Sequence, residues 1–299
     1  MTFASIYRPG LFASKRFIVT GGGSGIGRCI AHELASLGAS VSLIGRSQHK
    51  LEKTAKEIAD DNGNDIVSWH TCDIRDEDRV KQVMGEILQQ GSIAGLVNNA
   101  GGQFPAPLAN ISKKGFESVV SSNLTGGFLF SRELLNQSID RDLISNEGCS
   151  IVNIVADMWG GMPGMGHSGA ARMGMVNLTQ TAAVEWAKYG YRVNAVAPGW
   201  IASSGFDAYS DPHIKKVLPK LGGTLPVNRL GTESEVSAAV CFLLGEGSAF
   251  ITGTTLQVDG GRPLNNHPIM APPAQHDNNK PFTGFHRHVT SKLLGGPGE

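Results

Sequence analysis

The segment that most constrains the fold is a glycine-rich stretch, Thr20-Gly21-Gly22-Gly23-Ser24-Gly25-Ile26-Gly27, which follows an apolar run and precedes an amphipathic one. A pyrophosphate needs backbone N–H groups and a helix N-terminus at close range, and side chains at Gly21, Gly25 or Gly27 would block the turn, the phosphate or the helix packing. The stretch predicts a dinucleotide-binding loop, with a ligand-free turn as the alternative for the motif alone. The cofactor contacts expected here are Gly21, Gly23, Ser24, Gly25, Ile26 and Gly27.

Up to about Asp259, short apolar runs alternate with longer amphipathic stretches, which is typical of βαβ units around a parallel sheet. Strands are expected at 17–19, 41–44, 95–97, 150–152 and 193–196, and helices over 26–37, 48–59, 76–89, 112–136, 170–188 and 232–245. We predict an α/β fold over residues 1–262, a single Rossmann-fold, doubly wound parallel sheet with helices on both faces. The Pro-, His- and Asn-rich residues 263–299 are expected to form an irregular extension that packs on the same domain.

The charge balance bears on the kind of partner. Lys plus Arg equals Asp plus Glu at 26 each, so the summed charge offers no field that would attract nucleic acid or an anionic membrane. We expect a small-molecule partner. The four cysteines have neither disulfide-framework nor metal-ligand spacing, so no metal site and a reducing, cytoplasmic setting are expected. We identify no signal peptide, no peroxisomal address and no apolar run near the roughly 20 residues of a membrane span.

The end of the second expected strand indicates which cofactor is used. An acidic residue at this position would accept hydrogen bonds from the adenosine ribose, but the sequence has Gly45 followed by Arg46. A guanidinium can pair with a 2′-phosphate, so NADP(H) is favoured, with NAD(H) possible. A solvated surface arginine is the alternative.

Several further motifs resemble the short-chain dehydrogenase/reductase family over residues 14–262. Besides the TGxxxGxG spacing, Cys72-Asp73-Ile74 resembles the segment whose Asp contacts adenine, and Asn98-Asn99-Ala100-Gly101 resembles the family's turn beside the adenosine and ribose. Asn123 matches the catalytic asparagine. The resemblance implies that the loop closing on the nicotinamide and diphosphate includes Pro198, Gly199, Ile201 and Ser203, and that Val258-Asp259-Gly260-Gly261 is the final strand.

The sequence departs from this family where Ser, Tyr and Lys are expected, because those positions carry Ala156, Ser168 and Arg172. A serine hydroxyl has too high a pKa to act like a tyrosine beside a lysine. Arg172 keeps a permanent charge for the nicotinamide ribose hydroxyls. His167, with an ordinary pKa of about 6.5, is the candidate for proton exchange, and a backbone-bonded loop histidine is the alternative. Asp157 is a second candidate, with a loop-orienting role as its alternative.

Two branches of the family share this pattern. His167-Ser168-Gly169-Ala170-Ala171-Arg172 resembles peroxisomal trans-2-enoyl-CoA reductases, as do residues 101–104 and 250–253. Residues 153–164 and the tail residues 282–287 resemble bacterial citronellol/citronellal dehydrogenases, which act on acyclic terpenes. Both likenesses imply a hydrophobic substrate, either free or linked to coenzyme A.

The substrate pocket is expected between residues 156–166, the 200–226 loop and the tail. Its lining is predicted to be Met158, Trp159, Met162, Met165, Trp200, Phe206 and Tyr209, with ordinary loop packing as the alternative. Lys215, Lys216 and Lys220 are candidates for coenzyme A phosphates.

Three functions remain open at this stage. The leading one is an NADP(H)-preferring oxidoreductase of an acyclic isoprenoid alcohol or aldehyde, as in terpene catabolism. The second is a trans-2-enoyl-CoA reductase of a fatty or isoprenoid acyl-CoA, and the third is a catalytically degenerate dinucleotide-binding sensor or structural subunit. The resemblance implies a homotetramer with contacts through residues 112–136 and 170–188.

Overall fold

The computed structural model describes residues 1–63, 66–208, 212–264, 273–274 and 279–298. Seven parallel strands form one sheet in the order β3-β2-β1-β4-β5-β6-β7. The strands are β1 (Arg16–Thr20), β2 (Ser40–Gly45), β3 (Val67–Thr71), β4 (Gly95–Asn98), β5 (Cys149–Ile154), β6 (Tyr191–Pro198) and β7 (Thr255–Val258).

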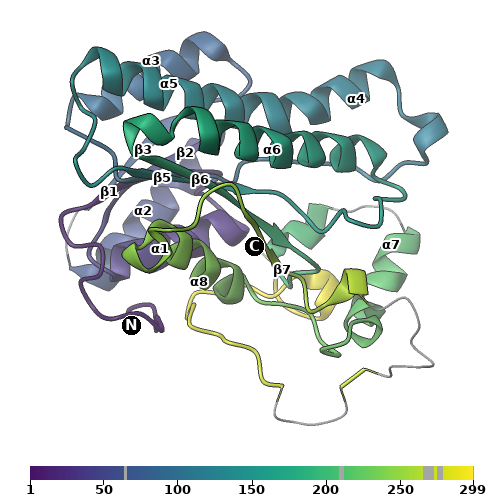
Figure 1. Ribbon diagram of the computed structural model, residues 1–299. Helices are drawn as coiled ribbons and strands as arrows, with labels where there is room; N and C mark the ends of the chain where they lie inside the picture. The colour runs from purple at the N-terminus through teal and green to yellow at the C-terminus, as the bar shows by residue number, and fades with distance from the viewer. Residues whose placement is uncertain (64–65, 209–211, 265–272, 275–278, 299) are drawn as a thin grey trace.

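Helices cover both faces of the sheet, which gives three layers (Figure 1). One layer contains α3 (Glu77–Leu88), α4 (Lys113–Val120), α5 (Gly126–Asp140) and α6 (Gly166–Glu185). The opposite layer contains α1 (Gly25–Ser36), α2 (Gln48–Asn62) and α8 (Glu233–Leu244), and the short α7 (Pro212–Val217) lies beyond the sheet edge. The predicted doubly wound parallel α/β sheet is confirmed.

The apolar runs of the strands are continuous because both faces of the sheet are buried. Successive side chains of β1 enter different clusters: Phe17 and Val19 belong to the cluster with side chains of α1 and α8, whereas Ile18 belongs to the cluster with Phe130 of α5. Two hydrophobic cores thus hold one sheet between them.

Three elements differ from the sequence prediction. The final strand, predicted at residues 258–261, is β7 (Thr255–Val258), and the chain turns after Val258. Strand β3 was not expected, because apolar and polar residues alternate in it and it lacks a continuous apolar run. It lies at the edge of the sheet, where its side chains are only partly buried. The single helix expected over 112–136 is divided by a π-helical turn, Ser121–Thr125. Asn123 lies in this turn, and its Nδ2 donates to the carbonyls of Val119 at 2.9 Å and Gly102 at 2.6 Å. The π-helical turn directs the Asn123 side chain toward the loop after β4. Single π-helical turns are frequent at functional sites.

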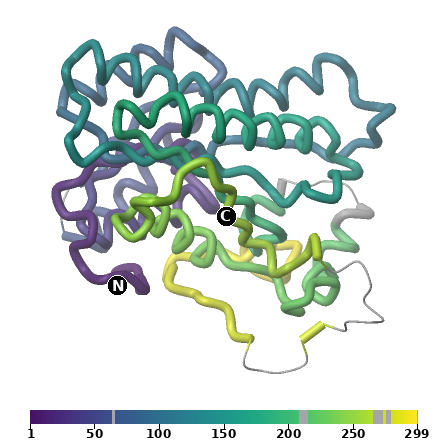
Figure 2. The backbone as a smooth tube through the Cα atoms, viewed as in Figure 1, coloured from purple at the N-terminus to yellow at the C-terminus, as the bar shows by residue number. Residues whose placement is uncertain are grey.

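The described part of the C-terminal segment lies against the α1/α8 layer, where the yellow end of the chain runs in Figure 2. Phe285 is buried, stacks on Phe3 with 5.8 Å between ring centroids, and donates its backbone N–H to Ser234 Oγ at 3.0 Å. Arg287 donates twice to the carboxylate of Asp61, at 2.8 and 2.7 Å. Aromatic packing and ion pairing therefore attach this segment to the α/β core.

Candidate active site

The strand order reverses between β1 and β4, and ligands of open α/β sheets bind at the carboxyl ends of the strands beside such a point. The glycine loop leaves β1 there and enters α1. Gly21 has φ of 69°, and a Cβ on it would lie 2.7 Å from Asn99 Nδ2. A Cβ on Gly27 would collide with the Gly21 carbonyl oxygen. The loop can therefore approach the strands closely only with glycine at these two positions.

The adjoining turn after β4 is tied to the same loop. Thr20 Oγ1 accepts the backbone N–H groups of Asn99 and Ala100, both at 3.0 Å, and Asn99 Nδ2 donates to the Thr20 carbonyl at 2.9 Å. These bonds hold the two loops side by side as the floor of the crevice.

Two adjoining cavities open over this floor, with volumes of about 720 and 600 Å³. They share Ser24, Lys50, Asn99 and Gly101, so together they follow the carboxyl edge of the sheet. The predicted cofactor residues that line one or both cavities are Gly21, Gly23, Ser24, Gly25, Ile26, Arg46, Asp73, Ile74, Asn99, Ala100, Gly101, Arg172, Pro198, Gly199, Ile201 and Ser203. Gly27, Asn123 and His167 are not part of either lining.

The smaller cavity carries a group of cations. Arg46 and Arg75 line it with Lys50. Arg75 donates to both carboxylate oxygens of Asp73, with Nη2 to Oδ2 at 2.6 Å and Nε to Oδ1 at 2.9 Å. These hydrogen bonds lower the pKa of Asp73 to about 2, against the effect of burial. The carboxylate of Asp73, which the family resemblance places against adenine, is thus ionised and paired with Arg75. The positive charges of Arg46 and Lys50 line the same cavity.

Arg172 is one of the charged residues that line the larger cavity. Its Nη1 donates to the carbonyls of Val155 at 2.8 Å and Ile154 at 3.2 Å, and its Nε donates to Ser168 Oγ at 3.1 Å. Ser168 in turn donates to Gln103 Oε1 at 2.5 Å. The chain of bonds from β5 through α6 to the loop after β4 fixes the guanidinium at the cavity wall.

The structure does not bring His167 to the cavity. Its side chain is 0% exposed, its ring meets Phe104 edge-on at 4.5 Å, and its Nδ1 accepts the backbone N–H of Ser168 at 3.0 Å.

Asn123 makes hydrogen bonds to both backbone groups of Gly102. Its Nδ2 donates to the Gly102 carbonyl, and its Oδ1 accepts the Gly102 N–H at 3.3 Å. Asn123 thus holds the loop that carries Gly101 and Gln103 in the cavity wall.

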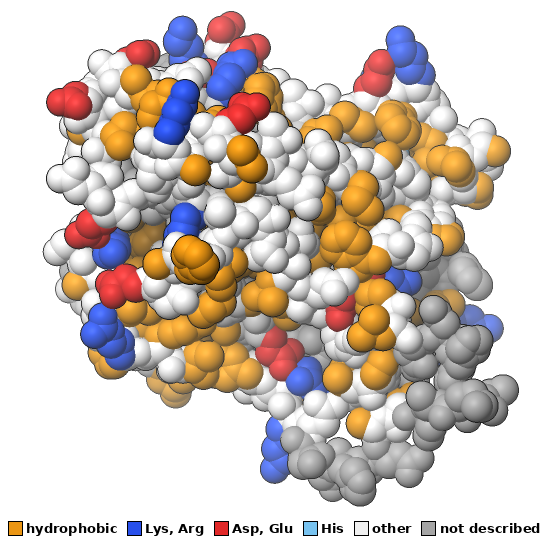
Figure 3. Space-filling model, in the orientation of Figure 1, with side chains coloured by type: hydrophobic (Ala, Val, Ile, Leu, Met, Phe, Trp, Pro, Cys, Tyr) orange, Lys and Arg blue, Asp and Glu red, His pale blue; other side chains and the backbone are white. Residues whose placement is uncertain are grey.

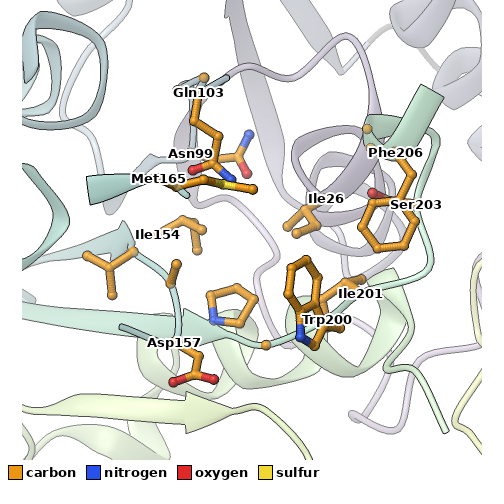
Figure 4. Close-up of a pocket in the computed structure, with 18 of the residues that line it drawn as sticks. Ile26, Asn99, Gln103, Ile154, Asp157, Met165, Trp200, Ile201, Ser203 and Phe206 are labelled. Carbon is orange, nitrogen blue, oxygen red and sulfur yellow. The ribbon is translucent and has the colours of Figure 1, made fainter. Parts of the chain in front are cut away.

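The rest of the larger cavity is mostly apolar. Figure 4 shows Met165, Ile154, Ile26, Trp200 and Ile201 around it, with Phe206 and Ser203 on one side and Asp157 at the opposite edge.

The predicted substrate residues are divided by the structure. Met162, Met165, Trp200 and Phe206 line the larger cavity, whereas Met158 is buried in the core and Trp159 is exposed elsewhere. Tyr209 lies outside the described residues. The described lysines Lys215, Lys216 and Lys220 are exposed and line neither cavity.

Five charged lining residues were not singled out from the sequence: Lys50, Arg75, Asp207, Arg262 and Lys292. Arg75 could have been found two residues after Asp73, and Arg262 directly after the motif of the final strand. Nothing in the local sequence marks Lys50 or Lys292, since their place depends on how α2 and the tail pack.

Within the described ranges, no cluster of three or more His, Cys, Asp or Glu side chains could hold a metal ion. No described helix combines the length and apolar character needed to cross a bilayer. The four cysteines are buried and unbridged.

Comparison with known proteins decides the family. Residues 21–262 match a family model described as enoyl-(acyl carrier protein) reductase. A probable 2,4-dienoyl-CoA reductase of Bacillus subtilis is 36% identical over 258 residues, covering 85% of this chain and 99% of its own. The chain belongs to the short-chain dehydrogenase/reductase family.

Solved structures agree with this assignment. A citronellol catabolism dehydrogenase of Pseudomonas aeruginosa is 57% identical with a TM-score of 0.75, covering 87% of this chain and 99% of its own. A putative NAD(P)-dependent gluconate 5-dehydrogenase of Beutenbergia cavernae with bound NADP is 29% identical with a TM-score of 0.77, covering 86% and 100%. The chain is therefore an oxidoreductase of a family that uses NAD(P).

The geometry fits such a dinucleotide. The N-terminus of α1 contributes Ser24, Gly25 and Ile26 to the larger cavity, where backbone N–H groups can receive a diphosphate. The smaller cavity adds the cationic wall at Arg46 and Arg75, and the larger one adds the Pro198 loop. An extended ligand can therefore lie along the carboxyl edge of the sheet.

Proposed function

We propose that this protein is an NADP(H)-preferring oxidoreductase that interconverts an acyclic isoprenoid alcohol and its aldehyde. The observation that carries the proposal is the composition of the larger cavity, where cofactor-loop residues such as Ser24 and Ile26 share one lining with Met162, Met165 and Phe206. A branched hydrocarbon chain packs well against methionine and aromatic side chains. The 57% identity to a citronellol catabolism dehydrogenase supports the same substrate class.

The preference for NADP(H) is proposed from the smaller cavity. Arg46 is exposed there beside the Arg75–Asp73 pair, and a guanidinium can hold a phosphate with two parallel hydrogen bonds. NAD(H) lacks the 2′-phosphate and would gain less from this wall.

The bound dinucleotide would accept or supply the hydride. Arg172, already oriented by the carbonyls after β5, would hold the nicotinamide ribose hydroxyls and keep the site positive. Asn123 would act through the loop after β4. Ala156, Ser168 and Arg172 occupy the positions where the family has Ser, Tyr and Lys, so we propose that proton transfer uses another group.

A second candidate is the reduction of an enoyl-CoA, in which hydride adds to the β-carbon and the α-carbon is protonated. The 36% identity to a probable dienoyl-CoA reductase favours it. The third candidate, a sensor or structural subunit without catalysis, is favoured only by the departures at residues 156 and 168.

One assay separates the three candidates. NADPH oxidation is followed at matched concentrations of citronellal and of a 2-enoyl-CoA, with Arg172→Met as the site variant and Arg141→Met as a control far from the cavities. We expect turnover of citronellal that falls with Arg172→Met and persists with Arg141→Met. Turnover of the thioester alone would replace the terpene proposal by the second candidate, and no turnover of either would support the third.

We further propose a homotetramer. Hydrophobic side chains cover much of the centre of the face in Figure 3, and Met173 and Val184 of α6 are exposed. This helix is one of the two expected contacts. Light scattering that gives a monomer mass at micromolar concentration would contradict the proposal.

The domain division and the cellular setting also remain proposals. We propose residues 1–262 as one domain with 263–299 as its extension, supported by the packing of Phe285 on Phe3. The unbridged cysteines are compatible with the proposed cytoplasmic setting.

A further inference from the structure

We propose that Ser291 is a positioning residue that makes the larger cavity select for long substrate chains. Its hydroxyl links the C-terminal segment to the loop that places Phe206 in the cavity lining. The inference rests on the proposed function, and it names a residue behind the lining that matches the pocket to a branched hydrocarbon chain.

Ser291 begins a short 3-10 helix, Lys292–Leu294, and is 0% exposed. Its Oγ accepts the backbone N–H of Leu293 at 3.1 Å and donates its proton to Asp207 Oδ1 at 2.6 Å. Its carbonyl accepts the backbone N–H of Gly296 at 3.0 Å. Because the hydroxyl uses both its proton and a lone pair, its direction is fixed, and the Asp207 carboxylate is held at a defined place.

Asp207 belongs to the 3-10 helix Ser204–Ala208, which carries Phe206 into the larger cavity. Phe206 is 7% exposed, and its ring centroid lies 6.4 Å from that of Trp200. Its backbone N–H donates to the Ser203 carbonyl at 3.2 Å. Phe206 and Asp207 are adjacent in the chain, so a hydrogen bond that holds the Asp207 carboxylate also restrains the backbone that places the Phe206 ring.

Phe206 lies away from the end of the cavity where the hydride is expected to pass. Figure 4 shows Phe206 and Ser203 on the opposite side of the cavity from Ile154. Arg172, the proposed partner of the nicotinamide ribose, donates its Nη1 to the Ile154 carbonyl at 3.2 Å. The Phe206 ring therefore faces the hydrocarbon chain of a bound substrate rather than its reacting carbon.

The C-terminal segment can support the loop because it is also attached to the α/β core. Phe285 is bonded to Ser234 and Arg287 to Asp61, before the chain reaches Ser291. The next residue, Lys292, lines the larger cavity itself. The segment therefore runs from a fixed point on the core to the cavity, and Ser291 is the contact at its far end.

The size of the effect follows from the single hydrogen bond. A hydrogen bond to a charged group changes an equilibrium by roughly tenfold or more. Asp207 is exposed, so solvent screening places the effect at the lower end of this range. Apparent substrate affinity falls with the fraction of protein whose loop is in place, so we expect about a tenfold loss for a chain that reaches Phe206. A chain too short to reach Phe206 should lose nothing.

The test compares Ser291→Ala, Asp207→Ala, the double variant and a matched control, Ser248→Ala. Ser248 is also 0% exposed and also donates its hydroxyl proton, but to the carbonyls of Leu243 and Gly245. It accepts from Arg192 near the amino end of β6, whereas both cavities lie along the carboxyl edge of the sheet. Ser248→Ala therefore removes a buried hydroxyl of the same kind without touching the loop.

The rates kcat and kcat/KM with NADPH are measured for citronellal and for the shorter branched aldehyde 3-methylbutanal, together with the Kd for NADPH and the thermal midpoint. Ser291→Ala and Asp207→Ala should each lower the citronellal to 3-methylbutanal ratio of kcat/KM about tenfold, through KM for citronellal at unchanged kcat. The double variant should lose no more than either single variant, because both remove the same bond. Ser248→Ala should keep the wild-type ratio, and the Kd for NADPH should stay at its wild-type value in all four.

A wild-type ratio in Ser291→Ala would overturn the inference. Equal losses for both aldehydes, or a matching rise in the Kd for NADPH, would overturn it too, since the bond would then serve stability or the cofactor. If Ser291→Ala does not fold, the ratio in Asp207→Ala, a change at an exposed residue, decides. Failure of the wild type to turn over citronellal refutes the proposed function instead. The ratio is then measured with a long and a short 2-enoyl-CoA, where an unchanged value in Ser291→Ala again overturns the inference.

Discussion

Replacing Arg287 by methionine should release the C-terminal segment without unfolding the α/β core. Two N–H groups of Arg287 bind the Asp61 carboxylate, and hydrogen bonds to charged groups contribute roughly 1.5–3 kcal/mol each. The arginine side chain is 30% exposed and His286 Nε2 remains 3.0 Å from Asp61, so solvent screening and the remaining partner reduce the loss. We expect about 2 kcal/mol, which corresponds to a roughly 30-fold larger open population of the segment.

Hydrogen exchange at the Phe285 amide measures this opening directly, because that N–H is bonded to Ser234 Oγ inside the packed segment. Exchange at this amide should be roughly 30-fold faster in Arg287→Met at neutral pH. Lys280→Met, which removes an exposed cation from the same tail, should leave it unchanged. Equal protection of Phe285 in both variants would refute the view that the Arg287–Asp61 pair attaches the tail.

Three further predictions concern pH, the cofactor and the loop. Burial opposes ionisation of Glu57, but a neighbouring histidine and arginine lower its pKa from 4.5 to about 2. The ionised Glu57 carboxylate therefore contributes fully to the free energy of unfolding above pH 4.5, and this contribution is lost as the pH falls to 2. The free energy of unfolding, measured by denaturant titration as the pH is lowered, should fall by roughly 3 kcal/mol because of this group. The variant Glu57→Gln should not show this fall. Arg46→Ala should raise the Kd for NADPH about tenfold and that for NADH much less, and equal effects in fluorescence titration would exclude Arg46 from phosphate binding. Gly27→Ala, whose methyl would meet the Gly21 carbonyl, should cost about 1–3 kcal/mol and weaken NADPH binding, whereas Gly160→Ala, with open space around it and outside both cavity linings, should bind NADPH as the wild type does.

Most of the residues predicted to contact the cofactor line the two cavities, and the sequence could point to them because they lie in short segments with local spacing. The glycine loop, the Asn99 turn and the Pro198 loop each follow a strand, and parallel strands bring their carboxyl ends to one edge. The parallel strand order alone therefore brings these three loops together at one edge of the sheet.

The rest of the site depends on packing that local spacing does not encode. His167 was a reasonable candidate by type, yet its ring is enclosed against Phe104, a contact between a loop and α6. Asp61 and Arg287 pair across 226 residues. The tail carries Lys292 to the cavity only because of such contacts. The π-helical turn at Asn123 likewise has the apolar spacing of an ordinary helix.

We propose that hydride passes in the larger cavity between NADP(H) and an acyclic isoprenoid alcohol or aldehyde. The most direct measurement is the steady-state rate of NADPH oxidation by the purified wild-type protein with citronellal, repeated with NADH and with a 2-enoyl-CoA. We expect oxidation of the cofactor with citronellal, at a higher kcat/KM for NADPH than for NADH. Oxidation with the thioester alone, or no oxidation with any of these substrates, would contradict it.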